Sequence, residues 1–325
     1  MAQSRSLRIN TGSSASGIAY LLLAGLLASA AVPMWRHPHQ AADFLFGKAL
    51  LRPDAPYVPL LRVLATGLAT AAVGSLALGG AAASGQLNQL TARRMTLGLA
   101  IMSLLELLVL VAHFCASTLT VRGFVAGSVL AALMAVLAGG SCLRWQQSVG
   151  HLRGFWADVR QMVGGRTGLG RWYGLVALLL IADHVQCLLM PTFTLKDFIG
   201  AGAGRRDAVF VLQALGAAFL ALPPWALVLK DEAESGQLRT ASRHNRMLLG
   251  AFLVASVGHM MALVPWWLTG RAGWGLPGLL IIWAVTLGSV LAGLAAQGGG
   301  VVATKGVHAP ASSRASTVTT SRREE

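Results

Sequence analysis

The sequence predicts an all-α integral membrane protein with eight transmembrane helices, arranged as two parallel four-helix repeats. Of its 325 residues, 55% are hydrophobic and only 12% are charged, and the mean hydropathy is +0.62. Soluble globular domains carry about 25% charged residues, so this composition indicates that the bilayer is the solvent. Two further observations support the prediction. Eight long stretches are apolar, and one segment occurs twice.

The eight apolar stretches each have the length of a membrane span. A hydrocarbon core about 30 Å thick requires about 20 mostly apolar helical residues. Backbone that faces lipid must satisfy its own hydrogen bonds, and no alternating pattern of barrel strands is visible, so each stretch is expected to be a helix. The expected spans are residues 17–34, 57–82, 94–115, 121–141, 172–191, 207–229, 247–268 and 275–297.

The first stretch also fits a cleaved secretory signal, because basic residues precede it and Ala28-Ser29-Ala30 resembles a cleavage site. The corresponding run of the second half, 175–190, is followed by a proline just as the first run is. This parallel favours a retained helix. In the sixth stretch, Pro223 and Pro224 predict a kink or an end of the helix.

The repeated segment fixes the predicted organisation. SGQLNQLTARRMTLGLAIMS at 84–103 returns as SGQLRTASRHNRMLLGAFLVAS at 235–256, and apolar runs flank both copies in the same order. The linker fits either a short interfacial helix at 151–163 or a solvated connector. The expected units are an N-terminal segment (1–16), a first repeat (17–141), the linker (142–171), a second repeat (172–297) and a disordered tail rich in Gly, Ser and Thr (298–325).

The distribution of charge predicts the orientation of the protein in the membrane and argues against nucleic acid as a partner. Of the 26 lysines and arginines, 17 fall on the side that holds both termini, which places the termini in the cytosol. The net charge of +14 is spread thinly over loops without a basic helix, so we expect contact with anionic lipid and not with nucleic acid. Cys115, Cys142 and Cys187 lie at no metal or disulfide spacing. No metal and no cofactor are expected.

Polar residues at membrane depth are the candidate functional groups, because ionisable side chains in hydrocarbon are costly. Three interpretations are open: hydrogen bonds that hold the repeats in register, a proton or ion path, and a metal or haem site formed by the histidines. We favour the first and expect Glu106 to meet His259 between the repeats. The candidates are Glu106, His113, Asp183, His184 and His259.

Asp43 and Asp197 occupy equivalent positions in the two halves, each before a phenylalanine in a loop on the side away from the termini. We expect each to cap a short re-entrant or interfacial helix. A cation or substrate contact is the alternative for both residues.

One helix carries a family resemblance. The segment RMLLGAFLVASVGHMMALVPWWLTG at 246–270 resembles the third helix of the ergosterol-biosynthesis scaffold family, small four-helix proteins of the endoplasmic reticulum that tether sterol-demethylating enzymes. His259 matches the histidine of that family, but Met260, Met261 and Ala262 stand where an acidic residue normally follows. The resemblance implies membrane-bound enzymes as partners and favours the endoplasmic reticulum or another endomembrane.

The first half is similar to small membrane proteins of the DoxX type, through Pro33, the segment DFLFG at 43–47, and Leu61-Arg62 before a helix that contains glycine. Together the two resemblances imply a duplicated four-helix unit from families that mostly lack an obvious catalytic constellation.

The sequence favours a non-catalytic scaffold or a lipid-associated accessory protein. It contains no phosphate-binding loop, nucleophile elbow, metal-binding helix motif or long soluble domain. The main alternative is a small-solute or proton-coupled carrier with a site between the repeats. A third is an intramembrane enzyme in which Asp183 and His184 perform acid or base chemistry on a lipid. Membrane lipids are the expected partners, and the oligomeric state stays open.

Overall fold

The structure is a computed structural model that describes residues 11–47, 57–146, 164–198, 200, 205–239, 242–270 and 272–303. Most of these residues are helical, and none of them lies in a strand. Within them, eight segments are long and apolar enough to cross a membrane, which confirms the predicted number. The helix predicted at 151–163 lies outside the described residues.

Seven long helices each supply one span. They are α1 (Thr11–Arg36), α3 (Tyr57–Ala83), α4 (Leu90–Cys115), α5 (Val121–Gln146), α7 (Gly168–Leu189), α11 (Arg243–Leu268) and α12 (Leu276–Ala303). The helix α12 continues past Gln297, where the tail was expected to begin. Both ends of the sequence-based spans otherwise agree with the structure to within a few residues.

The sixth span is broken, as the two prolines predicted. It consists of α9 (Arg206–Phe219) and α10 (Leu222–Glu234), which are separated by a turn at Leu220 and Ala221. Pro223 stands in the first turn of α10, where a missing backbone N–H removes no helical hydrogen bond. The break leaves α9 and α10 free to pack against different neighbours.

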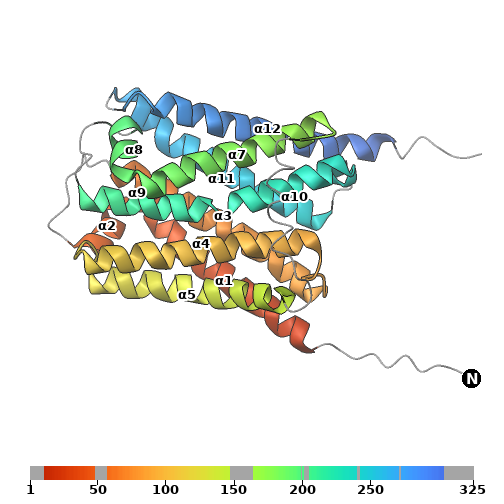
Figure 1. The fold of residues 1–325 in the computed structure, drawn as a ribbon, viewed down its shortest axis with the longest axis horizontal. Coiled ribbons are helices and arrows are strands. Elements are labelled where there is room, and N and C mark those ends of the chain that lie inside the picture. Colours follow the sequence, from red (N-terminus) through yellow and green to blue (C-terminus); the bar gives the residue numbers. More distant parts are fainter. Residues whose placement is uncertain are drawn as a thin grey trace, which may run out of the picture.

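Two short helices lie at the same end of the molecule (Figure 1). They are α2 (Pro38–Phe46) and α8 (Pro191–Phe198). Each is tied to the start of a later membrane helix. The backbone N–H of Thr120, just before α5, donates to the Leu45 carbonyl at 2.7 Å, and that of Gly273, just before α12, donates to the Phe198 carbonyl at 3.1 Å.

The helix α3 occupies the centre of the bundle, with α1, α4 and α5 on one side and α7 and α12 on the other (Figure 1). Its membrane-spanning segment is 78% buried, against 33% for α1 and 22% for α5. The helices α1 and α5 therefore present most of their surface to lipid.

The helix contacts within the first half resemble those within the second half. The helix α1 packs against α3, and α7 packs against α9 and α10; α4 packs against α5, and α11 packs against α12. Between the halves, α3 packs against α11, while α4 packs against α9 and α10. Two of the buried tyrosines make similar contacts, because Tyr20 donates to the Leu137 carbonyl at 3.4 Å and Tyr173 donates to the Ser289 carbonyl at 3.0 Å.

Glycines allow the two halves to approach closely. The Trp225 side chain of α10 is fully buried, and its indole N–H donates to the Met95 carbonyl at 3.0 Å. A Cβ on Gly74 of α3 would lie 2.2 Å from this indole, and a Cβ on Gly98 of α4 would lie 2.6 Å from its nitrogen. Without a hydrophobic force between helices in lipid, such close packing is what drives association.

Candidate functional site

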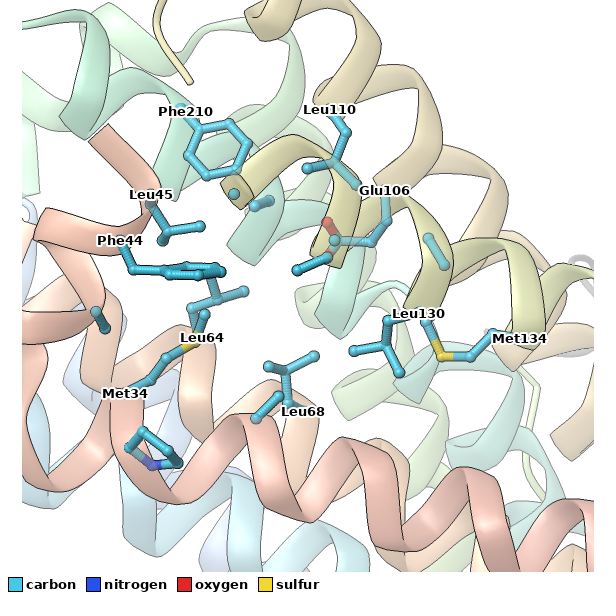
Figure 2. Close-up of a pocket in the computed structure, with 18 of the residues that line it drawn as sticks. Met34, Phe44, Leu45, Leu64, Leu68, Glu106, Leu110, Leu130, Met134 and Phe210 are labelled. Carbon is cyan, nitrogen blue, oxygen red and sulfur yellow. The ribbon is translucent and has the colours of Figure 1, made fainter. Parts of the chain in front are cut away.

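A cavity of about 410 Å³ lies in the first half of the chain, bounded by α1, α2, α3, α4, α5 and one face of α9. This volume falls in the range of small-molecule sites. Figure 2 shows leucine, methionine and phenylalanine side chains around an open centre. Apart from Glu106 and Gln40, the described residues that line it are apolar: Ala30, Pro33, Met34, Ala41, Phe44, Leu45, Leu64, Leu68, Leu110, Gly123, Ala126, Gly127, Leu130, Ala131, Met134, Phe210 and Ala214.

Small residues on α5 create this space. Gly123, Ala126, Gly127 and Ala131 all face the cavity, so the helix contributes little side-chain volume there. Gly127 cannot be enlarged without moving its neighbour, because a Cβ would lie 2.9 Å from the Leu110 side chain of α4. The helices α4 and α5 thus stay in close contact at the cavity wall, where both Gly127 and Leu110 line it.

Among the residues that the structure describes, Glu106 is the one ionisable residue that lines the cavity. It belongs to α4, its side chain is buried, and its Oε1 atom has no hydrogen-bond partner among the described residues. In Figure 2 the carboxyl group points toward the open centre. A buried polar group without a partner is destabilising, so the site favours a ligand that completes its hydrogen bonds.

The cavity lies close to lipid. Two of its walls are α1 and α5, the helices with the most lipid-facing surface in this half. Phe44 of α2, at one end of the cavity, is 47% exposed. The cavity is therefore bounded in part by elements that lie at the periphery of the bundle.

The second half contains a polar cluster where the first half has the cavity. Asp183 and His184 of α7 and His259 of α11 meet around the buried side chains of Phe219 and Trp283. The His259 ring is stacked on the Trp283 ring, with centroids 3.6 Å apart. The remaining space, lined in part by Asp183 and His259, is about 20 Å³.

Each histidine of the cluster is held by a contact with a backbone carbonyl one turn earlier in its own helix. The Nδ1 atom of His184 lies 2.6 Å from the Leu180 carbonyl, and that of His259 lies 2.8 Å from the Ala255 carbonyl. The Nε2 atom of His184 is buried without a hydrogen bond and lies 3.7 Å from the Asp183 carboxylate. Among the described residues, no three His, Cys, Asp or Glu side chains gather in a way that would hold a metal ion.

Glu106 and His259 do not meet, so the pairing expected from the sequence is wrong. Glu106 lines the large cavity beside α5, while His259 lies in the second half against Trp283. The physical reason is the choice of helix contacts. The helix α4 packs on α5, α9 and α10, whereas α11 packs on α3 and α12.

His113, one of the candidates from the sequence, makes a hydrogen bond between the halves with a residue that was not among those candidates. Its Nε2 atom lies 2.7 Å from the Oε1 atom of Gln213 in α9. The amide nitrogen of Gln213 in turn donates to the Leu188 carbonyl of α7 at 2.9 Å. This chain of contacts joins α4, α9 and α7.

Asp43 and Asp197 lie on the two short helices, as expected, but they do not cap them. Each stands in the last turn, while the first residues are Pro38 in α2 and Pro191 in α8. The N-cap residue of α2 is His37. Their contacts are at the helix ends: the Asp43 carbonyl accepts from the Gly47 N–H, and the Asp197 carbonyl accepts from the Gly275 N–H, both at 2.9 Å.

Fold and site together define a multi-pass integral membrane protein with an apolar cavity and one buried carboxyl group inside it. Comparison with models of protein families finds no match for this chain, and no curated protein matches it.

Proposed function

We propose that this multi-pass membrane protein is a non-catalytic, lipid-associated accessory protein that holds one lipid molecule in the cavity of its first half. The observation that carries the proposal is the apolar cavity of about 410 Å³ with the unpartnered Glu106 carboxyl group directed into it. Preformed apolar cavities with a few convergent polar groups are the usual form of ligand sites.

The lipid source follows from the position of the cavity. Its walls α1 and α5 face the bilayer, so lipid is present at its edge at high local concentration. The carrier alternative requires a site between the halves. Apart from the face of α9 that bounds the cavity, contacts between the halves are close: Gly74 faces the Trp225 ring, and a Cβ on Gly258 would lie 2.4 Å from the Thr66 side chain.

Internal duplication is part of the proposal. The paired helix contacts, the two tyrosine hydrogen bonds and the repeated segments at 84–103 and 235–256 support it. One half then keeps an open cavity, while its counterpart is filled by aromatic and histidine side chains. The same displacement along the chain that places Met95 on Met247 places Ala131, which lines the cavity, on Trp283.

Orientation and partners are proposed on sequence grounds. The excess of lysine and arginine on the side of the termini supports a cytosolic location for both. The resemblance to the ergosterol-biosynthesis scaffold family supports an endomembrane location and membrane-bound enzymes as partners, to which a bound lipid would be presented.

Filling the cavity tests the proposal. Ala131→Trp puts into α5 the side chain that the second half carries at Trp283, and we expect it to abolish retention of lipid. Val129→Trp on the same helix is the matched control, because Val129 is 56% exposed toward lipid. Wild type and both variants are purified in mild detergent, and bound lipid is measured by native mass spectrometry.

The wild type and Val129→Trp should each retain one lipid, and Ala131→Trp should retain at least tenfold less. Equal lipid retention in all three proteins would contradict the proposal. A stoichiometric enzyme partner recovered with a wild-type protein that contains no lipid would replace it with the scaffold function.

A further inference from the structure

The polar groups of the cavity limit the head group that a bound lipid can have. Glu106 offers one carboxyl group, and its Oε1 atom has no partner among the described residues. The other polar residue that lines the cavity, Gln40, lies in α2 and is exposed at the edge of the bundle. Around Glu106 itself, the wall consists of apolar side chains such as Leu110, Leu130 and Phe210.

Charged head groups do not fit this environment. A phosphate requires several donors or a cation, and among the described residues the cavity wall contains no lysine, arginine or histidine. An ammonium group has three N–H donors, and the single carboxyl group leaves part of them without a partner in an apolar wall. Each buried polar hydrogen that stays unpaired weakens binding.

A hydroxyl group fits because it has one donor and can also accept. A buried carboxyl group that keeps its proton can donate its O–H to the hydroxyl oxygen and accept the hydroxyl hydrogen on its other oxygen. Both groups are then satisfied without a buried net charge, which hydrocarbon disfavours. Carboxyl and hydroxyl thus satisfy each other without help from the apolar wall.

From this balance of donors and acceptors, and resting on the proposed function, we infer that the cavity selects an uncharged lipid with a single hydroxyl group, held against Glu106. The apolar body of the lipid lies along α5, where the lining extends from Gly123 to Met134. At 1.5 Å per residue this face is about 16 Å long.

Two probes of equal chain length separate the head groups. They are hexadecanol and hexadecylamine, each with a photoactivatable diazirine in the chain, and both are added to the full-length protein in nanodiscs. We expect the wild type to capture the alcohol at least fivefold more than the amine. Labelled peptides should map to α5.

Two substitutions of Glu106 then test its role. Glu106→Gln keeps a donor and an acceptor, so capture of the alcohol should stay within threefold of wild type. Glu106→Leu removes both and should lower it about tenfold, the loss expected for one buried hydrogen-bonded group. Preference for the amine, with loss of capture in Glu106→Gln, would overturn the inference, as would equal capture of the alcohol in Glu106→Leu and wild type.

The variant Ala131→Trp distinguishes this inference from the proposed function. If it prevents capture of both probes while the Glu106 variants show no head-group preference, the cavity binds lipid and only the hydroxyl inference fails. If it leaves capture of both probes unchanged, the proposed function fails as well.

Discussion

At the scale of single residues, glycines decide which helices of the two halves can touch. Gly74 is the clearest case, because its missing side chain makes room for the buried Trp225 ring. Gly67 makes similar room for Ala218 and Phe219 of α9, at 3.0 and 3.1 Å from an added Cβ. These positions on α3, together with Gly98 of α4, allow the close contacts between the halves.

Gly74→Ala is expected to destabilise the protein by about 1 to 3 kcal/mol, because the added methyl group overlaps the Trp225 ring and forces it to shift. The measurement is the free energy of unfolding in detergent. Gly80→Ala on the same helix is the control, since its nearest neighbour outside α3 lies at an ordinary 3.8 Å. A loss of equal size in both variants would mean that the Trp225 contact is not the cause.

The sequence predicted some of these residues and missed others. Gly67, Ala71, Ser75 and Gly79 recur at one-turn spacing in the sequence, and the structure places Gly67 against α9 and Gly79 against α1. Gly74 lies outside that one-turn spacing, so nothing in the local pattern pointed to it. Glu106 was identified as a site residue from its charge alone. The side chains that surround it could not be predicted, because aligning the two similar segments does not show which helices pack together.

At the scale of secondary-structure elements, hydrogen bonds in the membrane link helices from different halves. His113 of α4 contacts Gln213 of α9, and Gln213 also contacts the Leu188 carbonyl of α7. Three helices are thereby joined through one amide group.

A double-mutant cycle should detect this link. His113→Ala and Gln213→Ala are expected to show a coupling energy of about 0.6 to 2 kcal/mol in unfolding experiments, the range known for hydrogen bonds between membrane helices. Gln213→Ala should also be the more harmful single change, because it leaves the Leu188 carbonyl without this donor. Additive effects of the two substitutions would show that the contact contributes nothing.

The elements themselves were largely predictable. Hydropathy located the eight spans, and Pro223 and Pro224 located the break between α9 and α10. The two short helices were expected, but with an aspartate at the start of each. Proline at the first helical position is the stronger signal for a helix start, and Pro38 and Pro191 carry it.

At the scale of the whole molecule, the two halves differ in how the space around their last membrane helix is filled. Around α5 the first half keeps a cavity, while around α12 the second half is filled by Trp283, His184, His259 and Phe219. The sequence could not predict this difference. Ala131 and Trp283 are both common residue types in an apolar helix. The positions of the surrounding helices decide that Ala131 lines a cavity and that the Trp283 side chain fills the space around it.

The most direct test of a lipid site in the first half is an experimental density map of the full-length protein in lipid nanodiscs. We predict continuous, elongated density in the cavity, running along α5 and ending at the Glu106 carboxyl group. The second half should show no comparable density beside Trp283. A map in which α1 and α5 close on each other, or in which the cavity contains no density beyond solvent noise, would contradict the lipid-binding function.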